Sequence, residues 1–203
     1  MGIAGKALAR FPSPPALPCR PAVYLLRKSI DVDFSHHVRG HDGPCINLHG
    51  HTWKFEVDLV AAELDAQGFV MDFGVLKRQV LKPCHALLDH SLAVGQATYA
   101  EVEEQLAGVG ERLLASRALP QAEQEPGLTE LGGAELRFPG GMRVAVFPFA
   151  PTSERLARWL YDLAHARLAD DRVGVHAARI YETLHPVHAV AEFVPSLAGS
   201  LKR

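Results

Sequence analysis

Two stretches near the start of the chain alternate apolar and polar residues, and this pattern constrains the fold more than any other feature. A period of two is typical of a strand that buries one face. The second stretch, residues 51–60, places four large apolar side chains on one face: Trp53, Phe55, Val57 and Leu59. The first stretch, residues 23–34, does the same with Ile30, Val32 and Phe34. A loop with two glycines and a proline joins them, so we expect an antiparallel pair.

Two helices are expected after these strands. Asp72 is a candidate N-cap, because its carboxylate can accept hydrogen bonds from free backbone N–H groups. Beyond it, apolar residues recur at roughly helical spacing up to Leu88, and Pro83 predicts a kink. Thr152 is the candidate N-cap of the second helix, whose apolar stripe has the spacing i, i+3, i+4, i+7: Leu156, Trp159, Leu160 and Leu163.

Residues 173–181 and 188–194 predict two further strands, with Pro186 in the turn between them. The resulting order is strand, strand, helix, helix, strand, strand. Segregated elements of this kind predict an α+β domain with helices packed on one face of an antiparallel sheet.

We assign this domain to residues 22–195. Prolines interrupt residues 1–21, so that segment is interpreted as a flexible tail rather than a secretory signal, and residues 196–203 as a C-terminal tail. Residues 97–135 contain eight Glu against two Arg. We therefore expect an acidic, partly helical insertion on the surface, at about residues 95–141.

Composition excludes several classes of function. The net charge of −2 gives no indication of binding to nucleic acid or to a membrane surface. No run approaches the roughly 18 apolar residues that a membrane-spanning helix needs. Three cysteines form an odd, sparse set that does not make a disulfide framework, so a reducing cytoplasm is the expected location.

The most unusual local feature is a concentration of histidines. Five of the eleven lie within sixteen positions: His36, His37, His41, His49 and His51. On a strand, His49 and His51 project to the same face at roughly 6.5–7 Å between Cα atoms, close enough to share an ion. A third histidine from the preceding strand or loop would leave one position open on a zinc ion, as in catalytic zinc sites. The alternative is a pair of exposed strand histidines.

Cys45 stands four residues before His49, on the loop that leads to the same strand. A thiol near a dication loses its proton easily and becomes a base or a nucleophile. Cys45 is alternatively a fourth ligand, which would close the site and make the zinc structural.

Two acidic positions later in the chain are candidate functional groups. Asp89 and His90 form an adjacent carboxylate and imidazole, a standard arrangement for general acid or base chemistry, although such neighbours also arise by chance. Glu182 lies late in an otherwise apolar strand, where its carboxylate could accept two parallel hydrogen bonds from an amidine-like edge. A solvated strand end is the alternative for Glu182.

Taken in order, these residues resemble the family of 6-pyruvoyltetrahydropterin and 6-carboxytetrahydropterin synthases, from about residue 30 to residue 194. The matching motifs are His36-His37-Val38-Arg39-Gly40, Cys45-Ile46-Asn47-Leu48-His49-Gly50-His51, Met71-Asp72-Phe73-Gly74-Val75-Leu76-Lys77, Leu88-Asp89-His90, Pro151-Thr152-Ser153-Glu154 and Tyr181-Glu182-Thr183.

The resemblance implies a T-fold, in which a four-stranded antiparallel sheet carries two helices on one side. Members assemble into barrels, commonly hexamers, with active sites between subunits. By resemblance His36, His49 and His51 bind zinc, and counting forward from Phe34 leaves His37 as an alternative to His36. The resemblance assigns the remaining roles to Cys45 as general base, Asp89 and His90 as proton-transfer pair, and Glu182 as anchor of the pterin ring.

Three residues separate Cys45 from the His-Gly-His motif, a spacing that resembles the bacterial 6-carboxytetrahydropterin synthases of the queuosine (7-deazaguanine) pathway. The expected reaction converts 7,8-dihydroneopterin triphosphate to 6-carboxytetrahydropterin, acetaldehyde and triphosphate. The alternatives are a 6-pyruvoyltetrahydropterin synthase, which releases triphosphate without acetaldehyde, and a non-catalytic protein that binds pterins or purines. The expected partners are a small pterin and further copies of the chain, with no nucleic acid and no membrane.

Overall fold

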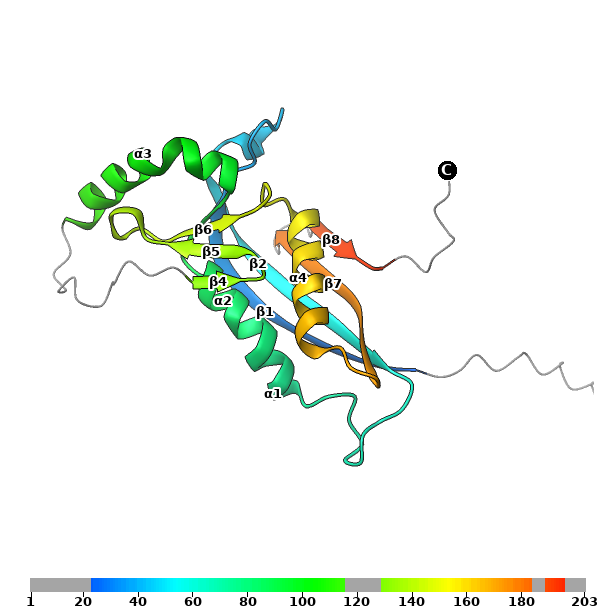
Figure 1. The fold of residues 1–203 in the computed structure, drawn as a ribbon. Coiled ribbons are helices and arrows are strands. Elements are labelled where there is room, and N and C mark those ends of the chain that lie inside the picture. The colour runs from blue at the N-terminus through cyan, green and yellow to red at the C-terminus, as the bar shows by residue number, and fades with distance from the viewer. Residues whose placement is uncertain (1–22, 116–128, 184–188, 196–203) are drawn as a thin grey trace, which may run out of the picture.

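The computed structural model describes residues 23–115, 129–183 and 189–195. The two predicted tails and the turn around Pro186 lie outside the described residues. The described strands form one sheet of eight, in the order β4-β5-β6-β3-β1-β2-β7-β8 (Figure 1). Its antiparallel half consists of β1 (Tyr24–His36), β2 (His49–Ala61), β7 (Val173–Thr183) and β8 (Ala189–Phe193).

The strands β1 and β2 form the predicted antiparallel pair, and the predicted apolar face is buried. Val32 and Phe34 of β1 are almost inaccessible, and Trp53, Phe55, Val57 and Leu59 of β2 are fully buried. The register pairs Phe34 with His51 and His36 with His49. Because side chains alternate between faces, His36, His49 and His51 share the face that buries the core.

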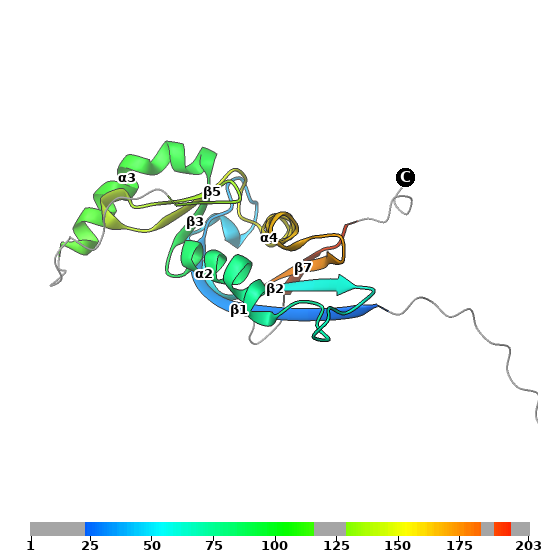
Figure 2. The same cartoon turned by 60° about the horizontal axis from the view of Figure 1, so that its bottom comes forward.

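Two helical segments cover that face, which confirms the α+β class. The first comprises α1 (Phe73–Leu76), a π-helical turn (Lys77–Leu81) and α2 (Lys82–Leu88); the second is α4 (Ser153–Leu168). Figure 2 shows α2 and α4 on the same side of β1 and β2. Both predicted N-caps are confirmed, since Asp72 accepts from the Gly74 N–H at 2.7 Å and Thr152 from the Arg155 N–H at 3.4 Å.

The kink predicted at Pro83 takes the form of the π-helical turn before it. Proline has no N–H, so it cannot bond to the carbonyl four residues earlier, that of Gln79. The Arg167 guanidinium of α4 donates to this Gln79 oxygen at 2.6 Å instead. The two helical segments are thereby joined at the position where the first one loses a backbone bond.

The sequence predicted that the acidic insertion lies on the surface, but part of the insertion is buried in the core. It contributes α3 (Gln96–Leu114), β4 (Thr129–Leu131) and β5 (Ala134–Arg137), and flanking strands β3 (Leu92–Gly95) and β6 (Val144–Phe147) join it to β1. Leu131, Ala134 and Leu136 are buried in the main core. Strands that pair with a sheet edge and alternate apolar residues can extend the core, and this outweighs the acidic composition.

Short 3₁₀ turns lie at Pro44–Ile46, in the β1–β2 loop, and at Pro139–Gly141, between β5 and β6. Within the described part of the chain, the helices are too short or too polar to cross a membrane.

Candidate metal centre and active site

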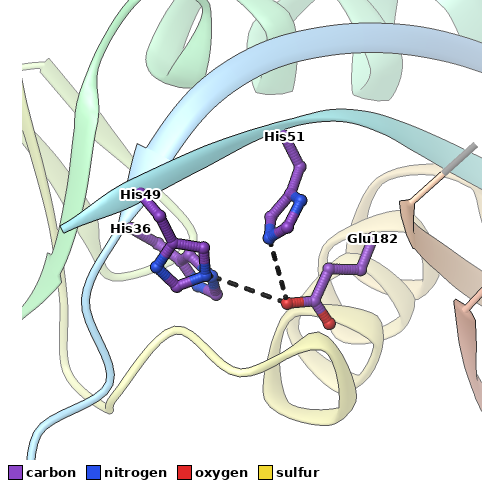
Figure 3. Close-up of side chains that lie close together, drawn as sticks. All are labelled: His36, His49, His51 and Glu182. Carbon is purple, nitrogen blue, oxygen red and sulfur yellow. Dashed lines mark hydrogen bonds and ion pairs between the residues drawn. The ribbon is translucent and has the colours of Figure 1, made fainter. Parts of the chain in front are cut away.

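Four side chains converge at one end of the core face (Figure 3). The potential ligand atoms of His36, His49, His51 and Glu182 all lie within 4.8 Å of one another. His36 is the last residue of β1, His49 the first of β2, and Glu182 lies near the end of β7. The pairing of β2 with both β1 and β7 therefore brings the group together.

Hydrogen bonds orient two of the imidazoles toward the centre of this group. His36, which is fully buried, has its Nδ1 3.0 Å from the carbonyl oxygen of Pro151, and His49 has its Nδ1 2.8 Å from that of Asn47. A carbonyl oxygen only accepts, so the neutral form of each ring carries its hydrogen on Nδ1 and leaves the lone pair of Nε2 free. Such bonds are the usual outer partners of metal-binding histidines.

The two Nε2 atoms of His36 and His49 are 3.0 Å apart. With both hydrogens on Nδ1, two lone pairs face each other at this separation, and a shared cation relieves the repulsion. Two nitrogens that bind one tetrahedral zinc at 2.0–2.1 Å are separated by roughly 3.3 Å. The donor set of three imidazoles and a carboxylate is one that zinc accepts. The residues present therefore fit a zinc ion.

Burial favours the neutral, metal-binding form of the imidazoles. Loss of solvent is the largest influence on the pKa of both His36 and His51 and lowers it below the usual value. The nearby Glu182 carboxylate acts in the opposite direction on both pKa values but does not reverse the shift.

The two carboxylate oxygens of Glu182 have different neighbours: one faces the histidine cluster, and the other accepts a hydrogen bond from a residue outside it. Its Oε1 lies 3.5 Å from His36 Nε2 and 3.6 Å from His51 Nε2, beyond ordinary hydrogen-bond length. Its Oε2 accepts a hydrogen bond from the buried hydroxyl of Ser153, at the start of α4. In the sequence Ser153 stands out only as part of the Pro151-Thr152-Ser153-Glu154 motif, and its link to Glu182 has no signal in the local sequence.

His37 and His41 lie outside the four-residue group. His37 Nδ1 is 2.7 Å from the carbonyl oxygen of Ile46, and His41 Nδ1 accepts from the Gly43 N–H at 2.8 Å. Both interactions are within the β1–β2 loop and help to shape it. The geometry thus brings His36 rather than His37 to His49 and His51.

Cys45 is half-buried in the 3₁₀ turn of the same loop. Its carbonyl oxygen accepts from the Val38 N–H at 3.0 Å, which holds the turn against the end of β1. The group of four potential ligands contains Glu182 and not Cys45. The fourth candidate ligand is therefore a carboxylate, not the thiol considered from the sequence.

Asp89 and His90 form a bonded pair at the end of α2, with His90 Nδ1 2.9 Å from Asp89 Oδ2. Burial tends to raise the pKa of Asp89, but the His90 hydrogen bond and the charges of His85 and His90 outweigh it and lower the pKa. His90 has a φ of 56°, an uncommon conformation for a residue other than glycine, and its N–H donates to the Asp33 carbonyl at 2.7 Å.

The pair is separated from the histidine cluster by the sheet. His90 lines an open hollow together with Asp33, Ser35 and Thr52. These strand residues alternate with His36 and His51, so they project from the opposite face. His51 also lines this hollow, but the group of four potential ligands in one copy of the chain does not include Asp89 or His90.

A model of the 6-pyruvoyl tetrahydropterin synthase family matches residues 25–192, and the chain belongs to this family. Among individual proteins, the chain resembles the 6-carboxy-5,6,7,8-tetrahydropterin synthase of Haemophilus influenzae, with 27% identity over 79% of this chain and 94% of that one. It is 34% identical to the enzyme of the same name from Rickettsia typhi, over 47% of this chain and 70% of that one.

The fold resembles a crystal structure of an uncharacterized protein from Wolinella succinogenes. The TM-score is 0.65 at 22% identity, over 86% of this chain and 99% of the other. The likeness supports the T-fold architecture expected from the sequence.

Proposed function

We propose that the protein is a zinc-dependent 6-carboxytetrahydropterin synthase of the queuosine (7-deazaguanine) pathway. It would convert 7,8-dihydroneopterin triphosphate and one water to 6-carboxy-5,6,7,8-tetrahydropterin, acetaldehyde and triphosphate. The convergence of three histidines with Glu182 on the core face carries the proposal. The names of the relatives from Haemophilus influenzae and Rickettsia typhi support this member of the family.

His36, His49 and His51 would hold the zinc ion. When bound, zinc lowers the pKa of coordinated hydroxyl groups and fixes their orientation. The chain itself prepares the site: the Pro151 and Asn47 carbonyls hold two rings in the tautomer that presents Nε2. The Trp53 ring lies edge-on to the rings of His36 and His51. It keeps water away from the inner side of the histidine cluster.

Three further groups would act on the substrate. Cys45, as a thiolate, would remove a carbon-bound proton, a role that requires a reduced thiol and agrees with a cytoplasmic location. Asp89 would hold the His90 imidazole for transfer of a second proton. Glu182 would accept two hydrogen bonds from the amino group and ring N–H of the pterin. Its Oε1 keeps lone pairs for this purpose, because its contacts in the cluster are long.

The sheet separates Asp89 and His90 from the cluster, so the complete site would be shared between subunits of a homo-oligomer. In that arrangement the cluster of one subunit faces the Asp89–His90 pair of the next. A hexamer is the assembly that the family resemblance implies.

The test is incubation of the zinc-loaded, assembled protein with 7,8-dihydroneopterin triphosphate. Acetaldehyde and 6-carboxytetrahydropterin are expected in equal amounts, and Cys45→Ala is expected to abolish both without loss of zinc. Failure of the zinc-loaded protein to turn over this substrate would refute the assignment.

A second candidate is the 6-pyruvoyltetrahydropterin synthase activity after which the matching family is described. That reaction releases triphosphate and no acetaldehyde, so analysis of the products distinguishes the two. A non-catalytic pterin-binding protein would instead bind the pterin equally well after Cys45→Ala.

A further inference from the structure

The loop between β1 and β2, residues 37–48, carries Cys45 and is closed by its own hydrogen bonds. The Val38 N–H donates to the Cys45 carbonyl at 3.0 Å, and the rings of His37 and His41 also bond to backbone atoms within the loop. Such bonds determine the shape of the loop, but they do not attach it to the rest of the protein.

A contact with the inserted helix α3 provides this attachment. Arg39 Nη1 donates to the Oε2 atom of Glu101, in the second turn of α3. Among the described residues, this is the one hydrogen bond that joins the loop to an element beyond β1 and β2. The bond lowers the pKa of the Glu101 carboxyl and raises the pKa of the Arg39 guanidinium, so both groups are charged at neutral pH.

The helix α3 is itself fixed to the sheet. At Gly110 its backbone touches the turn before β6, because a Cβ atom there would lie only 2.6 Å from the Pro139 carbonyl oxygen. Closer to Glu101, the buried Tyr99 ring packs with apolar residues of β3 and β6, and the Arg137 guanidinium lies over it at 5.2 Å. A helix held at two points along its length can support a loop that contacts it.

The path of the chain explains why α3 reaches this loop. The strand β3 pairs with the last two residues of β1, Ser35 with Leu92 and His36 with Ala93. The helix α3 begins directly after β3, so its N-terminal end lies beside the loop that follows β1 (Figure 1). The insertion therefore contacts the loop only three residues after His36, at Arg39.

We propose that Arg39 and Glu101 are positioning residues, through which α3 holds the β1–β2 loop and keeps the Cys45 thiol at the active site. The role of Cys45 in the reaction rests on the proposed function, whereas the attachment of the loop to α3 rests on the contact alone. Both charged side chains are exposed, and a pair of this kind stabilises a conformation only modestly. Its loss is therefore expected to loosen the loop without unfolding the domain.

The reaction of Cys45 with iodoacetamide tests the attachment without turnover. Arg39→Gln and Glu101→Gln each remove the contact, and in the assembled, zinc-loaded protein each is expected to raise the alkylation rate of the half-buried thiol roughly two- to fivefold. Mass spectrometry of the peptide that contains Cys45 measures the rate. The matched control is Glu104→Gln, which removes the same charge from an exposed position on α3 and is expected to change the rate less than about 1.5-fold.

The two glutamine variants separate positioning from electrostatics. Arg39→Gln removes a positive charge and Glu101→Gln a negative one, so a purely electrostatic effect on the thiolate would change the two rates in opposite directions. Loosening of the loop raises both rates. Rates that move in opposite directions, or that match the Glu104→Gln control, would overturn the proposal.

Exchange of the two charges provides a rescue. Glu101→Arg alone places two guanidinium groups together and is expected to react at least as fast as Glu101→Gln. The double variant Arg39→Glu with Glu101→Arg restores an ion pair and is expected to return the rate to within about twofold of wild type. A double variant that reacts as fast as Glu101→Arg would contradict the attachment.

Turnover assays test the link to Cys45 chemistry. Both glutamine variants are expected to lower kcat roughly two- to fivefold with KM and zinc content near those of wild type, because the loop positions the candidate base rather than the substrate or the metal. An unchanged kcat beside a faster alkylation would overturn that link. If the wild type does not turn over the pterin, the proposed function fails, and the alkylation rates still decide the attachment.

Discussion

At the scale of single residues, the candidate metal centre depends on which nitrogen each histidine presents. The Pro151 carbonyl determines this for His36, and the Asn47 carbonyl determines it for His49. His37, one position after His36, instead lies against Ile46 of its own loop. Adjacent residues on a strand point to opposite faces, so only one of the two can share the face of His49 and His51.

Replacing His36 and His37 by alanine, one at a time, should show which of the two histidines is a zinc ligand. His36→Ala is expected to lower zinc affinity by more than the roughly 10–100-fold that loss of an outer partner costs, whereas His37→Ala should keep one zinc per chain. Metal content after dialysis against a competing chelator measures both. Loss of zinc from His37→Ala together with retention by His36→Ala would contradict the assignment.

Glu182 has two candidate roles that a single substitution distinguishes. As pterin anchor, Glu182→Gln should raise KM roughly 10–100-fold through loss of a charged hydrogen-bond pair while zinc content stays unchanged. Glutamine keeps an oxygen that can accept from Ser153, so the end of β7 should remain in place. Steady-state kinetics and metal analysis of the same preparation provide the measurement. A loss of zinc would instead make Glu182 a metal ligand.

At the scale of elements, the open face of the antiparallel half carries a ladder of charges across four strands. The ladder comprises Arg27 of β1, Glu56 and Asp58 of β2, Arg179 of β7 and Glu192 of β8. Asp58 is at its centre, with a side chain only 2% exposed that accepts from both Arg27 and Arg179 at 2.7 Å. This face is polar, and the described helices cover the opposite, apolar face of the sheet.

Removal of the central charge should destabilise the protein far more than removal of a peripheral one. Asp58→Asn leaves Arg27 and Arg179 with Glu56 as their remaining buried partner, and we expect a loss of about 3 kcal/mol in the free energy of unfolding. Glu192→Gln removes a 42% exposed partner of the same Arg179 and should cost less than about 1 kcal/mol. Urea unfolding measures both, and equal losses would refute the central role of Asp58.

The same ladder predicts a pH dependence. Burial raises the pKa of Asp58, but hydrogen bonds from Arg27 and Arg179 outweigh this and lower the pKa below its ordinary value of 3.8. The folded state therefore favours the ionised form, and the stabilisation is complete above the ordinary pKa and declines as pH falls through the folded one. The stability difference between wild type and Asp58→Asn should be constant from pH 8 to pH 5 and shrink below about pH 4.

At the scale of the whole molecule, the sheet divides the candidate catalytic groups between its two faces. The cluster lies on the face that α2 and α4 cover, and His90 lines the hollow beside Asp33, Ser35 and Thr52, whose side chains project from the other face. The inserted strands β4 and β5 extend the sheet on the side of β3 and β6.

Mixed oligomers test the shared site. His49→Ala and Asp89→Asn should each be nearly inactive alone. When the two are co-expressed with different tags and purified as mixed assemblies, activity should return to roughly a quarter of wild type, because one site in four combines two intact halves in a symmetric ring. Inactive mixed assemblies would show that both groups act within one chain.

The sequence by itself determined the features that depend on near neighbours. Alternation specified β1 and β2 and placed His49 and His51 on one face, and local capping chemistry specified the starts at Asp72 and Thr152. The order of the elements also identified the α+β fold, and the motifs identified the candidate residues. Each element and each motif is a pattern within a short stretch of sequence.

Only the tertiary structure decided which of these residues meet. His36 rather than His37 joins the cluster because of the β1–β2 register and a carbonyl 115 residues later, at Pro151. Glu182 approaches the histidines because β7 pairs with β2, and Ser153 holds it because α4 packs on the same face. The acidic insertion enters the core through strand pairing that composition does not reveal. Long-range pairing sets such distances, and no local pattern encodes them.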